Sequence, residues 1–89
     1  MPSMDVVIED AAGTRKKEVS VPDDVALARV AVRMVDILKM PLTAPTGEPM
    51  SYKFLHKETS KQLRDDATLS SSGVSRGDTL RLVPEITAG

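Results

Sequence analysis

The 89-residue chain contains no cysteine, and its only aromatic residues are one tyrosine and one phenylalanine. Without cysteine the chain has no disulfide, no thiolate metal site and no cysteine nucleophile, which fits a reducing compartment. Two aromatic rings offer little for stacking on nucleic-acid bases. These absences remove the commonest nucleophile and weigh against binding of single-stranded nucleic acid.

An excess of charge of one sign and long apolar runs are also missing. Twelve Lys and Arg residues against 13 Asp and Glu residues leave a net charge of -1, too little to attract nucleic acid or an acidic membrane. No segment approaches the ~20 apolar residues that span a bilayer, and no signal-peptide pattern opens the chain. We therefore expect one small cytoplasmic domain with no nucleic-acid partner and no membrane insertion.

The first half of the chain predicts a hairpin followed by a helix. Residues 4–9 and 15–21 alternate apolar and polar side chains around a turn signal, which indicates two paired strands. The Asp23-Asp24 pair is expected to cap a helix over residues 25–39, because carboxylates accept the free N–H groups of a first turn. The apolar face of this helix is expected to comprise Leu27, Val30, Ala31, Met34, Ile37 and Leu38.

The second half predicts three further strands, over residues 50–55, 62–63 and 79–83. Pro84 is expected to help end the last strand, because proline has no backbone N–H to donate to a neighbouring strand. A sheet with one apolar face and a helix with one apolar face bury each other. The order strand, strand, helix, strand, short strand, strand therefore predicts a two-layer α+β domain.

Residues that could carry catalysis are scattered. His56 is the only histidine, and its polar surroundings indicate a solvated loop residue and not a general base or a metal ligand. The acidic pairs, such as Asp65-Asp66, lie where caps and turns need hydrogen-bond acceptors. We expect no enzymatic activity, no cofactor and no metal.

Residues 62–80 contain in succession a Thr-Leu pair, a Gly-Val pair and a Gly-Asp-Thr-Leu turn and strand. This pattern resembles the bacterial YukD/EsaB-like branch of the ubiquitin-like proteins, and the order of elements over residues 4–89 resembles the ubiquitin fold, the β-grasp. The resemblance implies a mixed sheet packed on one long helix in a domain of residues 1–83. Residues 84–89 would form a flexible C-terminal tail.

The tail gives the sharpest functional hypothesis. Residues 83–89 end at the same distance beyond the last strand as the mature tail of ubiquitin, with Ala88-Gly89 in place of the usual Gly-Gly. The resemblance implies a protein modifier that is activated and conjugated to targets through Gly89. Its partners would be activating and conjugating enzymes, a processing peptidase and target proteins. A sulfur carrier would share the terminal glycine but would ordinarily end in Gly-Gly.

The resemblance also implies a partner-binding surface. Leu55 and Val83 match the exposed isoleucine and valine through which ubiquitin is commonly bound, and together with Arg81 they would form a small apolar and basic surface beside the tail. The alternative hypothesis, from the YukD/EsaB resemblance, is a non-conjugated accessory or regulatory protein of type VII secretion. In that role the tail is irrelevant.

Overall fold

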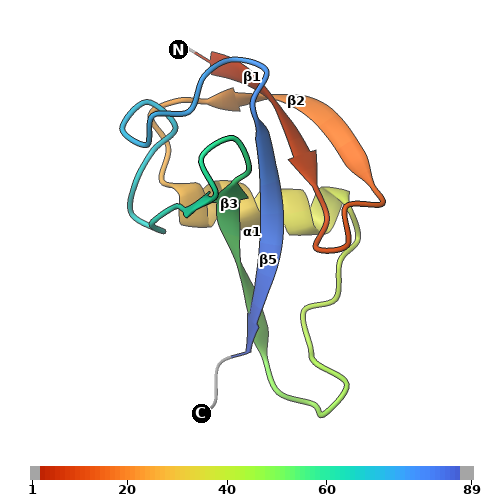
Figure 1. The fold of residues 1–89 in the computed structure, drawn as a ribbon. Coiled ribbons are helices and arrows are strands. Elements are labelled where there is room, and N and C mark those ends of the chain that lie inside the picture. Colours follow the sequence, from red (N-terminus) through yellow and green to blue (C-terminus); the bar gives the residue numbers. More distant parts are fainter. Residues whose placement is uncertain (1–2, 87–89) are drawn as a thin grey trace.

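Residues 3–86, which the computed structural model describes, form a five-stranded sheet with one helix on one face (Figure 1). The strands are ordered β2-β1-β5-β3-β4; β1 pairs with β5 in parallel, and the other neighbours are antiparallel. The expected α+β fold, a mixed sheet packed on one helix, is confirmed. The elements are β1 (Ser3–Glu9), β2 (Lys16–Pro22), α1 (Leu27–Ile37), β3 (Met50–His56), β4 (Lys61–Gln62) and β5 (Thr79–Ile86).

The hydrophobic core lies between α1 and the inward face of the sheet. Period-two alternation turns every second strand residue toward the helix, as the sequence predicts for β1, β3 and β5. Leu80 of β5 is 1% exposed and lies opposite Ile8 of β1 and His56 of β3. The core residues are Val6, Ile8, Val21, Leu27, Val30, Ala31, Met34, Val35, Leu38, Tyr52, Phe54, Leu63, Leu69, Val74, Leu80 and Leu82.

The start of α1 differs from the prediction. The helix begins at Leu27, and its N-cap is Ala26, which makes no side-chain capping bond, so the expected cap by Asp23-Asp24 is wrong. The N–H groups of Leu27 and Ala28 instead donate to the backbone carbonyls of Ala67 and Asp65, at 2.8 and 3.0 Å. A segment distant in sequence thus supplies acceptors that an isolated helix would take from its own cap.

Backbone hydrogen bonds end α1 before the chain reaches Pro41. Lys39 has a positive φ of 54°, and the N–H of Met40 donates to the carbonyl of Val35 while that of Lys39 donates to Asp36. This is the Schellman arrangement, which usually has glycine at the position that Lys39 takes here. The helix is therefore four residues shorter than predicted, since it spans 27–37 and not 25–39.

The buried apolar stripe of α1 also differs from the predicted one, at one residue on each of its two margins. Val35, which was not predicted to be buried, is buried, whereas Ile37, which was, is 43% exposed. On a helix these two residues lie on opposite margins of the stripe centred on Met34 and Leu38. The sheet and the loop after α1 cover the margin of Val35 and leave the margin of Ile37 open.

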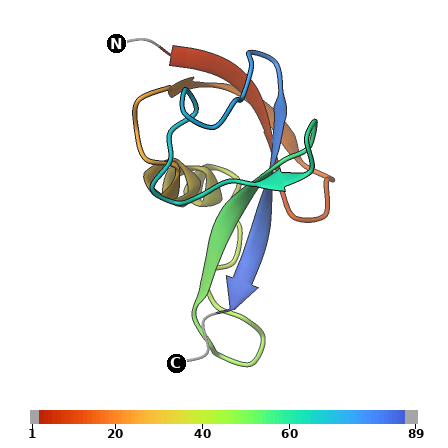
Figure 2. The same cartoon turned by 60° about the vertical axis from the view of Figure 1, so that its left-hand side comes forward.

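Strand β5 continues beyond the expected end. It pairs with β3 through Pro84 and Glu85 as far as Ile86, so the expectation that Pro84 helps to end the strand is wrong. β1 pairs with β5 only as far as Arg81, so Pro84 lies on a strand with one open edge, where a missing N–H is tolerated. Figure 2 shows β3 and β5 extending together as a ribbon beyond the helix.

Within the part of the chain that the structure describes, no helix is long and apolar enough to cross a membrane.

Truncation of Leu80 to alanine is expected to lower the free energy of unfolding by about 2–5 kcal/mol, because it leaves a cavity between the helix and the centre of the sheet. Val32→Ala is the matched control, since Val32 is 72% exposed on α1 and its change should be within about 0.5 kcal/mol of zero. Urea unfolding of both variants measures the difference. Equal stabilities would contradict this arrangement of the core.

Candidate functional site

Leu55, Arg81 and Val83 lie together on the face of the sheet that points away from α1. Leu55 of β3 is directly opposite Arg81 of β5, and Val83 lies diagonally from Leu55, opposite Lys53. All three side chains are partly exposed. We call these three residues the outer patch; the structure brings together the residues that the sequence singled out.

Arg81 is fixed on this face by a buried carboxylate. Its Nε donates to Oε1 of Glu9 at 2.8 Å, and Lys57 Nζ lies 3.3 Å from the same oxygen. Lys16 Nζ lies 4.0 Å from Oε2, the one buried side-chain oxygen among the described residues without a hydrogen-bond partner. Glu9 is 0% exposed although it is on the outer face. Three cations therefore surround one anion in the middle of an otherwise open surface.

The turn between β1 and β2 closes over this ion cluster. Gly13 lies above it with a φ of +74°, and a Cβ at this position would come within 3.1 Å of Arg81 Nη2. Asp10 holds the turn by accepting from the N–H and the hydroxyl of Thr14, both at 2.9 Å. Glycine suits residue 13 because its φ is positive and because a side chain there would crowd the guanidinium of Arg81.

The environment of Glu9 decides its charge. Burial by itself raises the pKa of this carboxyl, but hydrogen bonds from Arg81 and Lys57, together with their positive charges, outweigh it and hold the pKa below the ordinary value of 4.5. Glu9 is therefore ionised at neutral pH. Sequence reasoning missed it because alternation assigned it to the solvent, and only the pairing of Glu9 with Arg81 across β1 and β5 reveals its role.

The sequence suggested that His56 lies in a solvated loop, and this expectation is wrong. His56 is the last residue of β3, 2% exposed, because the alternation of Tyr52 and Phe54 continues one residue further and turns the imidazole inward. Its Nε2 lies 2.7 Å from Oδ2 of Asp78 and its Nδ1 lies 2.9 Å from the hydroxyl of Thr59. Both ring nitrogens are thus engaged within the domain.

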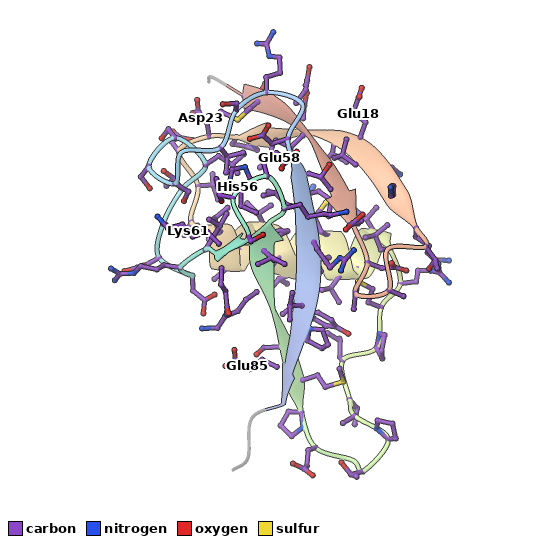
Figure 3. All side chains as sticks on the ribbon, viewed as in Figure 1. Glu18, Asp23, His56, Glu58, Lys61 and Glu85 are labelled. Atoms are coloured by element: carbon purple, nitrogen blue, oxygen red, sulfur yellow. The ribbon has the colours of Figure 1, made fainter. Side chains whose placement is uncertain are left out.

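Glu58 and Asp78 complete a cluster around His56, in which one ligand atom from each residue lies within 4.8 Å of the others. Figure 3 labels His56 and Glu58 in this region. Each group is already used inside the protein. Asp78 Oδ2 accepts the N–H of Ser75 at 2.9 Å, and both oxygens of Glu58 lie 3.1 Å from the N–H of Thr79. The Ser75 N–H and the His56 hydrogen bond hold the pKa of Asp78 below its ordinary value. We infer that this cluster holds the turn before β5 against the end of β3.

Gly89 and Ala88, the predicted conjugation terminus, lie outside the described residues.

One helix packed on a mixed sheet, whose first and last strands are parallel neighbours, defines the class of ubiquitin-like β-grasp domains. The family model described as WXG100 protein secretion system (Wss), protein YukD, matches residues 4–82. The chain therefore belongs to the YukD family, which confirms the resemblance seen in residues 62–80. No curated protein sequence matches the chain.

Solved structures agree with this class. A ubiquitin of Caldiarchaeum subterraneum is 25% identical, with a TM-score of 0.65, and the match covers 99% of this chain and 100% of that one. The ubiquitin-like domain of EccD5 from Mycobacterium xenopi has a TM-score of 0.77 at 16% identity, over 99% of this chain and 100% of that one. The likeness to the EccD5 domain shows that this chain and that domain share a fold.

The substitution Glu9→Gln tests the ion cluster because it removes the charge and keeps the shape. At neutral pH we expect a loss of about 1.5–3 kcal/mol in the free energy of unfolding, the contribution of hydrogen bonds to a charged group. Since the folded-state pKa of Glu9 is lowered, its stabilisation is present above the ordinary value of 4.5 and is lost as pH falls through the lowered value. The difference between the wild type and Glu9→Gln should therefore shrink on acidification.

Glu18→Gln is the control for this experiment, because Glu18 is exposed on the neighbouring strand β2. Denaturant titrations at several pH values between neutral and acidic measure both variants. If Glu9→Gln matches Glu18→Gln in stability and in pH dependence, the buried carboxylate does not fix Arg81.

Proposed function

We propose that the chain is a non-conjugated accessory or regulatory protein of type VII secretion that works by binding another protein. The observation that carries this proposal is the match of the YukD family model to residues 4–82. The likeness to the EccD5 ubiquitin-like domain adds only that the two domains share a fold.

The outer patch is the surface through which the chain would bind. Leu55 and Val83 offer aliphatic contact area, and Arg81 between them offers a planar cation. The terminal nitrogens of Arg81 make no hydrogen bond with another described residue, whereas its Nε is held by Glu9 at 2.8 Å. A side chain that is already oriented loses little conformational freedom on binding. The partner would present a carboxylate to Arg81 and aliphatic groups to Leu55 and Val83.

In this role the chain catalyses no reaction and acts in the cytoplasm. The hydrogen bonds of His56 support the first point, because both ring nitrogens are occupied and the ring is almost fully buried. A general base must reach the proton that it removes. Recognition of a protein surface requires no such group.

A second candidate function is the ubiquitin-like modifier, conjugated through Gly89 by separate activating and conjugating enzymes. The similarity that favours it is to the Caldiarchaeum subterraneum ubiquitin, at 25% identity over nearly the whole of both chains. In the modifier function Ala88-Gly89 is indispensable, whereas in the secretion function these two residues are dispensable. This difference separates the two candidates.

Charging the outer patch tests the proposed binding surface. We expect Leu55→Glu and Val83→Glu each to weaken capture of components of the secretion system from cell extract at least about tenfold, a loss of about 1.4 kcal/mol. Both side chains are partly exposed, so the melting temperature should remain close to that of the wild type. Val32→Glu, on the exposed side of α1, is the matched control and should bind normally. Unchanged capture by both patch variants would contradict the assignment.

Deletion of Ala88-Gly89 tests the choice between the two functions. In cells that lack the wild-type gene, the shortened chain should restore export of WXG100 proteins to the medium, measured by immunoblotting, because the proposed function needs no terminal carboxylate. Loss of export, together with loss of a covalent adduct in the presence of ATP, would establish the modifier in its place.

A further inference from the structure

Strand β2 forms one edge of the sheet and has an unused side. Among residues 3–86 its only strand neighbour is β1, with which it pairs over Lys16–Pro22. An edge strand presents backbone N–H and C=O groups to which a further strand can pair. No other strand within residues 3–86 pairs with this side of β2.

A groove runs between this edge and α1, with a volume of about 580 Å³. Its walls are aliphatic on both sides, and we call it the edge groove. β2 and the following loop contribute Val19, Val21 and Val25, and α1 contributes Val30, Met34 and Ile37.

The apolar walls of the edge groove are only partly covered by the domain itself. Ile37 is 43% exposed, and Val19 and Val25 are half-buried against the core. The cause is geometric, since the apolar stripe of α1 is wider than the surface that the sheet covers. An aliphatic ligand could therefore remove further apolar area from water without unfolding any element.

Two exposed cations, Arg33 and Lys17, lie at or beside the edge groove. Arg33 of α1 lines it, and Lys17 continues the inward row of Val19 and Val21 along β2. Neither cation forms a salt bridge with a described residue, and both side chains are exposed. Arg15 Nη1 donates to the carbonyl of Leu38 at 2.7 Å, which brings the start of β2 to the C-terminal end of α1. Lys17 therefore lies at this end of the groove.

We propose that the edge groove binds an extended acidic and aliphatic segment of a partner protein, which adds to β2 as a sixth strand. Backbone groups of the segment pair with the open side of β2, and alternate aliphatic side chains enter the groove between Val19, Met34 and Ile37. Acidic residues of the segment lie beside Lys17 and Arg33. The complementary charges favour an acidic flank and select against a basic one.

This site is independent of the outer patch. The outer patch lies on the face of the sheet away from α1, whereas the edge groove opens between the helix and the far edge strand. The proposal therefore goes beyond the proposed function, and it holds or fails whichever protein binds the outer patch.

Titration of the ¹⁵N-labelled chain with synthetic decapeptides tests the proposal. The panel consists of peptides with four alternating Val, Ile or Leu residues next to two or three Asp or Glu residues. We expect micromolar affinity for at least one peptide, with chemical-shift changes concentrated in Lys16–Pro22 and on the groove side of α1. Replacing the acidic flank by lysines, or placing a proline in the aliphatic part, should weaken binding at least about tenfold, since charge and strand pairing are both lost.

Variants of the chain supply the matched comparison. Arg33→Glu and Ile37→Asp should each weaken binding of the acidic peptide at least about tenfold, and Lys17→Glu should reduce the preference for the acidic flank. Arg29→Glu, also exposed on α1 but outside the edge groove, and Leu55→Glu, in the outer patch, should bind as the wild type does. Thermal melts establish that each variant is folded.

Three results would overturn the proposal. The first is the absence of shift changes with every peptide of the panel at millimolar concentration. The second is shift changes that map to the outer patch and disappear in Leu55→Glu. The third is concentration-dependent self-association that Ile37→Asp abolishes, which would make a second copy of the chain the occupant of the groove.

Discussion

β1 and β5 pair in parallel over only three positions, yet this pairing joins the N-terminal hairpin to the C-terminal half of the molecule. On the inner face it places Ile8 beside Leu80 in the middle of the core. On the outer face it places Glu9 beside Arg81, which lie 72 positions apart in the chain. The packing of α1 follows from this contact because the core uses side chains from both halves, and the position of Arg81 in the outer patch follows from it because Glu9 of the N-terminal hairpin holds the arginine.

The two faces of the sheet are stabilised in different ways. The inner face is apolar and is covered by α1, so its burial supplies most of the favourable free energy of folding. The outer face has no second layer, and a carboxylate ringed by Arg81, Lys57 and Lys16 takes the central position instead. An ion cluster of this kind orients an arginine that remains partly exposed.

The edge groove arises from a mismatch between helix and sheet. α1 has apolar residues on both margins of its stripe, but Val35 on one margin is buried, whereas Ile37 on the other margin is 43% exposed. The uncovered margin faces β2, an edge strand with free backbone groups. If both proposed surfaces bind, one small domain would contact two partner segments at once.

The sequence by itself determined the order of the elements, the class of the fold and most of the core. Alternation identified the inward residues of β1, β3 and β5, the helical period identified the centre of the α1 stripe, and residues 62–80 indicated the family. The elements and the core follow from local periodicity, which neighbouring residues set, whereas the family follows from the resemblance in residues 62–80. The resemblance to ubiquitin also predicted that Leu55, Arg81 and Val83 lie together, and their role in binding stays a prediction.

Only the tertiary structure decided the features that depend on residues distant in the chain. Glu9 is buried because Arg81 and Lys57 surround it, and His56 is buried because Asp78 and Thr59 satisfy both ring nitrogens. The start of α1 depends on carbonyls of residues 65–67, and the exposure of Ile37 depends on where the sheet ends. A polar side chain or a helix end can be buried only where a partner replaces water, and that partner is fixed when the whole chain folds.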